Sequence, residues 1–234
     1  MRIHAIIITF LFLAQGVLAQ TYISNGEKVS GTWKKSGSPY IVQGEAIVPA
    51  GKTLKIKKGV TVKFKTGFSR DYRMNGVINR SFDVGFLRVE GKIIAKAKSS
   101  DPILFTRDGV SGSWGNVCVN SDQDGSYFKY CIFEHAHYIR GITESDNATG
   151  SLTFLGANGK AEYCTFRNNA WTALNCKQYA APTFKNLTVV GNKYGLECNS
   201  NSSPDFYNCI MWDNETSFYI NGNAKPNVSY SLLQ

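Results

Sequence analysis

The chain has 234 residues, 43% of them hydrophobic, and a formal net charge of +9. The positive charge favours acidic partners, but it is spread along the chain instead of being gathered in one run. Beyond the N-terminus, no apolar segment is long enough to cross a membrane. We therefore expect no membrane span and no nucleic-acid partner.

The first 19 residues have the pattern of a signal peptide. Arg2 gives a charged start, Ile6 to Leu13 form an apolar run, and Val17-Leu18-Ala19 is a small-residue cleavage pattern. The apolar run is too short to be a stable membrane-spanning helix. We predict cleavage after Ala19 and a protein that is secreted, periplasmic or on the cell surface.

Short strands and turns follow in quick succession. Residues 20–37 are polar and rich in Gly and Ser, so we expect a loose lead-in. From Ser38 onwards short alternating runs are punctuated by Gly and Pro, which predicts strands and turns. Residues 66–84 show little alternation, and we expect them to project from the body as a loop or insertion.

The last third of the chain repeats itself every 22 residues. The clearest columns are Pro182/Pro204/Pro226, Phe184/Phe206/Val228, Leu187/Cys209/Ser231 and Leu174/Leu196/Phe218. A fixed period in this range is typical of solenoids, and apolar pairs two residues apart indicate half-buried strands. We predict an all-β, single-stranded parallel β-helix. A 33-residue step separates residues 128–133 from 161–166, which predicts a longer turn within 143–160.

Several segments carry a family resemblance. Residues 38–42, 48–54, 59–64 and 101–106, together with the Asn-rich later coils, resemble secreted right-handed parallel β-helix proteins with pectate-lyase-like repeats. The resemblance implies a right-handed solenoid over residues 38–234, with about eight to ten coils. That group includes polysaccharide lyases, glycoside hydrolases, epimerases, carbohydrate-binding proteins and adhesins.

The six cysteines follow the repeat. Cys131, Cys164 and Cys209 share one inward column, and Cys176 and Cys198 share another. Cysteine is a good small apolar core residue, so we expect mostly free, buried thiols. A disulfide between Cys176 and Cys198 stays open as the exception, although the parallel Cβ vectors disfavour it. Cys118, between two valines, is expected to point outwards.

Candidates for acid–base chemistry are few. His135 and His137 lie two apart after residue 133, where they could serve a metal or a proton transfer, and a solvated turn is the alternative. A polysaccharide lyase would need a base beside a group that neutralises a uronate, for which Arg167 and Lys185 are the candidates. No dense carboxylate cluster of the glycosidase kind is present.

Asp122 and Asp124 lie in a turn that resembles the start of a calcium loop. The twelfth position of that loop, where a bidentate Glu is expected, is Cys131. We predict a plain acidic turn and no cofactor, with Ca²⁺ as the open alternative.

Aromatic and basic residues between the inward positions point to ligand binding. Tyr163, Trp212, Lys129 and Tyr207 are the candidates, since exposed rings on a flat sheet can stack on sugar faces. The predicted function is a non-catalytic extracellular module that binds polysaccharide, which the charge suggests is acidic, or a scaffold. Open alternatives are a polysaccharide lyase or related carbohydrate-active enzyme, and an adhesin-like surface protein.

Residues 229–233 resemble a coil that normally continues. An uncovered last coil presents unpaired strand edges, which can pair with another chain. Self-association through this coil is therefore a further expectation.

Overall fold

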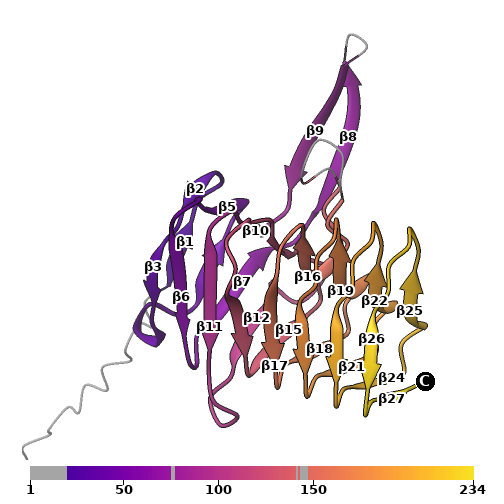
Figure 1. Cartoon of the computed structure of the whole chain (residues 1–234). Helices are drawn as coiled ribbons and strands as arrows, with labels where there is room; N and C mark the ends of the chain where they lie inside the picture. Colours follow the sequence, from indigo (N-terminus) through magenta and orange to yellow (C-terminus); the bar gives the residue numbers. More distant parts are fainter. Residues whose placement is uncertain (1–19, 75–76, 141, 143–146) are drawn as a thin grey trace, which may run out of the picture.

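A computed structural model describes residues 20–74, 77–140, 142 and 147–234, and the predicted signal peptide lies outside them. Three long parallel sheets, of nine, eight and eight strands, make up the body. Each coil of the chain contributes one strand to each sheet in turn, and the coils stack into a rod (Figure 1). The prediction of an all-β parallel β-helix is confirmed, and nine strands in the first sheet match the expected eight to ten coils.

The three sheets are named here in the order in which the chain visits them. Sheet A contains β1 (Thr21–Ile23), β4 (Tyr40–Val42), β7 (Thr61–Lys65), β12 (Ile103–Asp108), β15 (Cys131–Glu134), β18 (Thr165–Arg167), β21 (Thr188–Val190), β24 (Ile210–Trp212) and β27 (Leu232–Leu233). Sheet B contains β2 (Glu27–Lys28), β5 (Glu45–Val48), β10 (Phe86–Val89), β13 (Val117–Val119), β16 (Gly150–Leu155), β19 (Thr172–Lys177), β22 (Tyr194–Cys198) and β25 (Thr216–Ile220). Sheet C contains β3 (Gly31–Trp33), β6 (Thr53–Lys57), β11 (Lys92–Lys96), β14 (Ser126–Lys129), β17 (Gly159–Glu162), β20 (Thr183–Lys185), β23 (Asp205–Tyr207) and β26 (Asn227–Ser229). A 3-10 turn, η1 (Lys35–Gly37), follows β3.

The 22-residue columns of the sequence are neighbours across the coils. Phe184 pairs with Phe206 and Phe206 with Val228, all in sheet C. In sheet B, Leu196 pairs with Leu174 and with Phe218. Strands in adjacent coils lie about 4.8 Å apart, so a side chain facing the interior packs on its counterparts above and below.

The first coil begins before the expected boundary. Residues 20–37 do not form a loose lead-in, because β1, β2 and β3 pair with β4, β5 and β6. Ile23, Val29 and Trp33 enter the core, and Trp33 stacks on Tyr40 with ring centroids 4.5 Å apart. Three buried apolar residues are enough to anchor this coil, although the surrounding sequence is polar.

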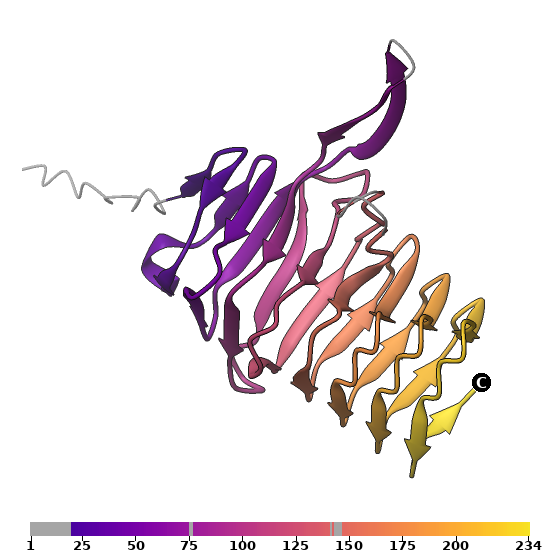
Figure 2. The same ribbon diagram turned by 45° about the horizontal axis from the view of Figure 1, so that its top comes forward.

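The expected insertion at residues 66–84 is an antiparallel hairpin, β8 (Phe68–Met74) and β9 (Val77–Asp83). It leaves the rod between β7 and β10 and projects away from the stacked coils (Figures 1 and 2). The longer turn expected within 143–160 lies earlier, between β15 and β16, because residues 150–155 and 159–162 are already strands.

Alternating residues of every sheet fill the interior of the rod. Phe105, Phe133 and Phe166 stack in consecutive coils of sheet A, with centroid distances of 4.5 and 4.9 Å and nearly parallel rings. All six cysteines are buried and none is in a disulfide, Cys176 and Cys198 included. Burial raises the pKa of the thiols of Cys131, Cys176 and Cys209.

Thiol reactivity tests this arrangement. We expect the native protein to react slowly with a thiol reagent such as iodoacetamide, because buried neutral thiols are poor nucleophiles. All six should be labelled in denaturant, as mass spectrometry would show. Rapid labelling of the native protein at Cys131 or Cys176 would contradict the stacked interior.

Cys118 points away from the interior, as expected, yet it is fully buried. It belongs to a second apolar cluster on the outer side of sheet B, whose other members are Val84, Phe86, Ile139, Ile142, Ala148 and Leu155. This cluster exists because chain segments from long corners cover part of that sheet. Within the described residues, no helix is long and apolar enough to pass through a membrane.

Candidate functional site

The outer face of sheet C carries a row of long polar side chains. Successive coils place Lys57, Lys96, Lys129, Glu162, Lys185 and Tyr207 side by side. These residues alternate with inward apolar residues such as Phe128 and Phe184, so the pleat forces them outwards. Two of the predicted binding residues, Lys129 and Tyr207, thus share one column with the lyase candidate Lys185.

Two lysines of this row, Lys96 and Lys129, lie over tyrosine rings. Lys96 Nζ is 4.4 Å from the Tyr127 centroid. Lys129 Nζ is 5.6 Å from the Tyr130 centroid and 5.4 Å from that of Tyr163. These distances are in the range of cation–π contacts.

Two corner tyrosines extend this arrangement. Tyr130 and Tyr163, both with positive φ at the turn between sheets C and A, stack on each other at 5.0 Å. Lys185 Nζ lies 5.9 Å from the centroid of the half-exposed Tyr207. Lysines and tyrosines therefore recur along five successive coils, and we call this set the Lys–Tyr strip: Lys96, Tyr127, Lys129, Tyr130, Tyr163, Lys185 and Tyr207.

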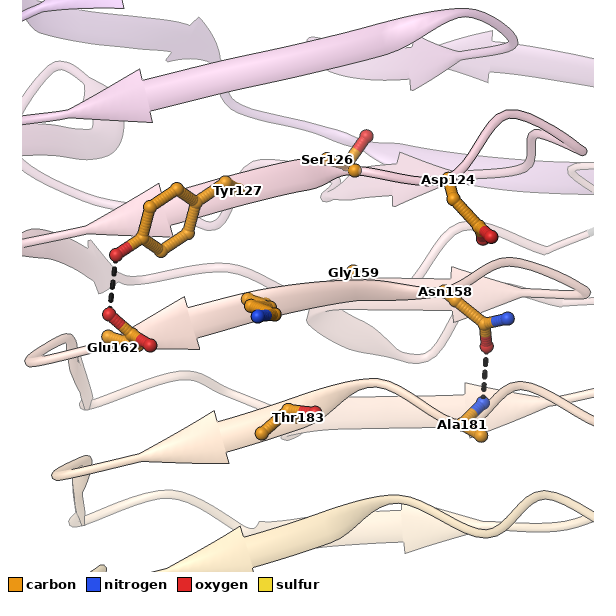
Figure 3. Close-up of a pocket in the computed structure, with 10 residues that line it drawn as sticks. Asp124, Ser126, Tyr127, Asn158, Gly159, Glu162, Ala181 and Thr183 are labelled. Atoms are coloured by element: carbon orange, nitrogen blue, oxygen red, sulfur yellow. Dashed lines mark hydrogen bonds between the residues drawn. The ribbon is translucent and has the colours of Figure 1, made fainter.

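A groove of about 540 Å³ lies beside the strip on the same face (Figure 3). Tyr127, Glu162 and Thr183 line it from three successive coils, and Asp124 and Asn158 line it at the turns between sheets B and C. The Tyr127 hydroxyl donates a short hydrogen bond to Glu162 Oε2, drawn in Figure 3. The groove therefore runs across coils, in the direction of the rod axis.

The Tyr127–Glu162 pair is joined by a hydrogen bond inside the groove. Burial, followed by the hydrogen bond to Glu162, raises the pKa of Tyr127. Tyr127 is therefore a neutral phenol at physiological pH and serves as a hydrogen-bond donor, not as a base. Since Glu162 accepts that bond, one of its oxygens is already engaged inside the protein.

The strip lysines differ from three other lysines of the chain in forming no ion pair with a described carboxylate. Lys35, Lys63 and Lys65 form ion pairs with Asp101, Asp108 and Asp83 at 3.1, 3.5 and 2.6 Å. Among the residues placed in the structure, no carboxylate lies within ion-pair distance of Lys96, Lys129 or Lys185. Their charge is available to an acidic ligand.

Two other candidates lie on the outer face of sheet A. Arg167 forms an ion pair with Glu134 of the preceding coil, with 2.7 Å between Nη2 and Oε2. Trp212 lies two coils after Arg167 in the same column. Arg167 and Lys185, the two candidates for lyase chemistry outside the histidines, are thus on different sheets. Trp212 is half-exposed but does not belong to the Lys–Tyr strip.

The histidines lie at the corner between sheets A and B. Burial and the nearby Arg107 lower the pKa of His135, and burial lowers that of His137. His137 contacts Tyr138 and Trp171, with ring centroids 4.4 and 5.7 Å away. Both side chains are neutral at physiological pH and do not adjoin the strip.

Asp122 and Asp124 are exposed in the turn before β14, and Asp124 reaches the groove. Over the described ranges, the search for three or more His, Cys, Asp or Glu side chains able to hold a metal together finds no group. The Ca²⁺ alternative therefore gains no further ligand from this region.

Sequence reasoning missed Lys96 and Tyr127 as members of the site. The coil of Lys96 precedes the regular 22-residue frame, so no column connected it with Lys129, whereas Tyr127 lies two residues before Lys129 in the same strand. The signal was present, however, since Lys92–Lys96 and Ser126–Lys129 both alternate apolar and polar residues and end in lysine. Aligning the two segments would have extended the column by one coil, to Lys96.

The stacked coils and their three parallel sheets define a solenoid, and the Lys–Tyr strip lies on its outer face. A family model described as a right-handed β-helix region matches residues 94–233. The chain belongs to this right-handed β-helix family, which confirms both the expected handedness and the repeat fold. Searches against curated proteins and against solved structures give no match.

Proposed function

We propose that this chain is an exported, non-catalytic module that binds acidic polysaccharide along the outer face of sheet C. The Lys–Tyr strip carries the proposal. Its ammonium groups suit carboxylate or sulfate groups, and its tyrosine rings suit the apolar faces of sugars. Export rests on the predicted signal peptide, residues 1–19.

The spacing of the strip favours an extended polymer. Coils recur about every 4.8 Å along the rod, so cationic and aromatic groups are presented repeatedly in one direction. The groove beside the strip spans three coils, from Tyr127 to Thr183. A long ligand aligned with the rod would contact several of these groups at once, and weak individual contacts would add together.

The hydrogen bond between Tyr127 and Glu162 supports binding over catalysis in the groove. Tyr127 is held as a neutral phenol by its raised pKa, and Glu162 accepts a hydrogen bond from its hydroxyl. Arg167 is paired with Glu134 on sheet A, away from Lys185. The lyase and adhesin alternatives have no specific side-chain arrangement of their own among the described residues.

Charge reversal at Lys129 tests the proposal. We expect Lys129→Glu to weaken binding to polygalacturonate about tenfold at low salt, since it removes one attraction and adds one repulsion. Affinity gel electrophoresis in gels with and without polygalacturonate would measure the effect. Lys28→Glu is the matched control, because Lys28 is exposed on sheet B and the net charge changes equally.

Two results would overturn the proposal. One is equal retardation of Lys129→Glu and Lys28→Glu variants. The other is the release of unsaturated products from polygalacturonate, followed by ultraviolet absorbance, which would establish a lyase. Retardation that persists unchanged at high salt would also count against a charge-based site.

A further inference from the structure

Four tyrosines of the chain have a left-handed backbone at turns between strands. The φ angle is 51° at Tyr130, 54° at Tyr163, 62° at Tyr179 and 50° at Tyr230. A positive φ crowds Cβ against the following carbonyl oxygen, so bulky residues rarely adopt it. Asparagine and glycine tolerate this conformation far better. Tyrosine is therefore an unfavourable residue for the backbone at these four turns.

Other coils show that asparagine fits the same turns. Tyr163 is aligned with Asn186 of the next coil, where φ is also 54°. Tyr179 is aligned with Asn201 of the next coil, where φ is 60°. Since the backbone has the same conformation with either residue, the fold does not require a ring at these positions.

All four tyrosines border sheet C. Tyr130, Tyr163 and Tyr230 lie at the corner between sheets C and A, directly after β14, β17 and β26. Tyr179 lies at the opposite edge, in the turn between β19 of sheet B and β20 of sheet C. No tyrosine has a positive φ at the corners between sheets A and B that the structure describes. The strained rings thus flank the one face that carries the Lys–Tyr strip and the groove.

Packing within the chain explains only part of this arrangement. Tyr163 stacks on Tyr130 with ring centroids 5.0 Å apart, and Tyr230 meets Tyr207 edge-on at 5.1 Å. Tyr179, however, is 75% exposed, and no described residue makes an aromatic contact or a hydrogen bond with its side chain. Its ring therefore adds little to the stability of the chain. Residues in such unfavourable backbone conformations cluster at ligand sites.

The turn that carries Tyr179 is fixed at the edge of the groove. Its own N–H donates to the carbonyl of Ser200 in the following coil at 2.9 Å. Two residues later, Ala181 lines the groove, and its N–H donates to Asn158 Oδ1 of the preceding coil at 2.9 Å (Figure 3). The turn is thus held from both sides, and it presents an exposed ring beside the groove.

We infer that the left-handed tyrosines are ligand-contact residues, and that the polysaccharide lies on sheet C with sugar rings against both edges of the sheet. This inference rests on the function proposed above, and it makes sugar rings, in addition to charge, what the surface recognises. The strip lysines bind the acidic groups of the polymer. The rings of Tyr163 at one edge and Tyr179 at the other contact the apolar faces of its sugars.

Tyr179→Asn in the full-length mature protein tests the inference, because it installs the residue that the next coil has at the aligned position. Surface plasmon resonance on immobilised polygalacturonate should show an apparent Kd about fivefold higher than that of the wild type. The urea midpoint of unfolding should not fall, since asparagine suits the left-handed backbone. Tyr163→Asn should weaken binding to a similar extent.

Tyr219→Asn is the matched control. Tyr219 is also half-exposed, but it lies in β25 of sheet B, its φ is not positive, and its ring contacts Tyr194 at 5.7 Å. Because tyrosine is favoured over asparagine in strands, this variant should have a lower urea midpoint and unchanged binding. The control and Tyr179→Asn are therefore expected to differ in opposite ways.

Immobilised poly-L-glutamate separates sugar recognition from charge, because it has carboxylates but no sugar rings. Its binding should be weakened by Lys129→Glu and unchanged by Tyr179→Asn. If both tyrosine variants bind polygalacturonate like the wild type, the inference is overturned and the charge-based function stands. The inference also fails if Tyr179→Asn weakens binding to both polymers equally, or lowers the urea midpoint as much as Tyr219→Asn. A wild-type protein that does not bind polygalacturonate would overturn the proposed function and this inference together.

Discussion

Replacement of Phe133 by alanine is expected to lower the free energy of unfolding by about 3–5 kcal/mol. Phe133 is fully buried and lies between Phe105 and Phe166, with centroids at 4.5 and 4.9 Å and nearly parallel rings. Its ring also packs edge-on against Phe128 of the same coil, with ring centroids 5.8 Å apart. Removing it leaves a cavity lined by rings that the stacked backbone cannot bring together.

Urea denaturation followed by circular dichroism would measure this loss, with Ile132→Ala as the control. Ile132 is in the same strand but faces outwards and is only half-buried, so its replacement should cost well under half as much as that of Phe133. Equal costs at the two positions would contradict the assigned direction of the side chains in β15.

The sequence predicts the late coils well because their corners hardly vary in length. From β19 onwards each paired residue lies 22 positions after its partner, so sequence spacing equals spatial register. In the earlier coils the corners between sheets A and B vary in length, and the hairpin β8–β9 interrupts one of them. Spacing there no longer reports register, which explains why Lys96 was not aligned with Lys129.

The candidate site could be predicted only in part, because alternation shows that a residue faces outwards but not on which sheet. Tyr207 and Trp212 are five residues apart and about equally exposed. A turn at Asn208, with φ of 53°, separates β23 from β24 and sends the two rings to different sheets. Lys129 and Lys185 lie 56 positions apart in the sequence, yet they share one column.

The same limit applies to the first coil. Residues 20–37 contain only three residues that become its apolar core, Ile23, Val29 and Trp33. Their irregular spacing gives no strand pattern. The adjacent coil supplies the missing partners, since β4, β5 and β6 offer paired edges to β1, β2 and β3. This stabilisation comes from stacking and leaves little trace in local sequence.

Asn192→Ala is expected to lower the free energy of unfolding by about 2–4 kcal/mol, because it breaks a ladder of buried amides. Asn192 Oδ1 accepts hydrogen bonds from the backbone N–H and Nδ2 of Asn169, at 3.0 and 2.8 Å. Its Nδ2 donates to the carbonyl of Phe166 at 3.1 Å and to Asn214 Oδ1 at 2.9 Å. Alanine would satisfy none of these groups, and Asn169 is itself buried.

Asn227→Ala provides the matched control, since Asn227 makes an inter-coil amide contact of the same kind in an exposed position. Its Nδ2 donates to Asp205 Oδ1 at 3.2 Å, and water can replace that bond, so the cost should stay below about 0.5 kcal/mol. Chemical denaturation of both variants under identical conditions compares the two positions. If Asn192→Ala cost no more than Asn227→Ala, the buried ladder would not be what fixes the corner between sheets A and B. The register of the late coils would then depend on the apolar interior alone.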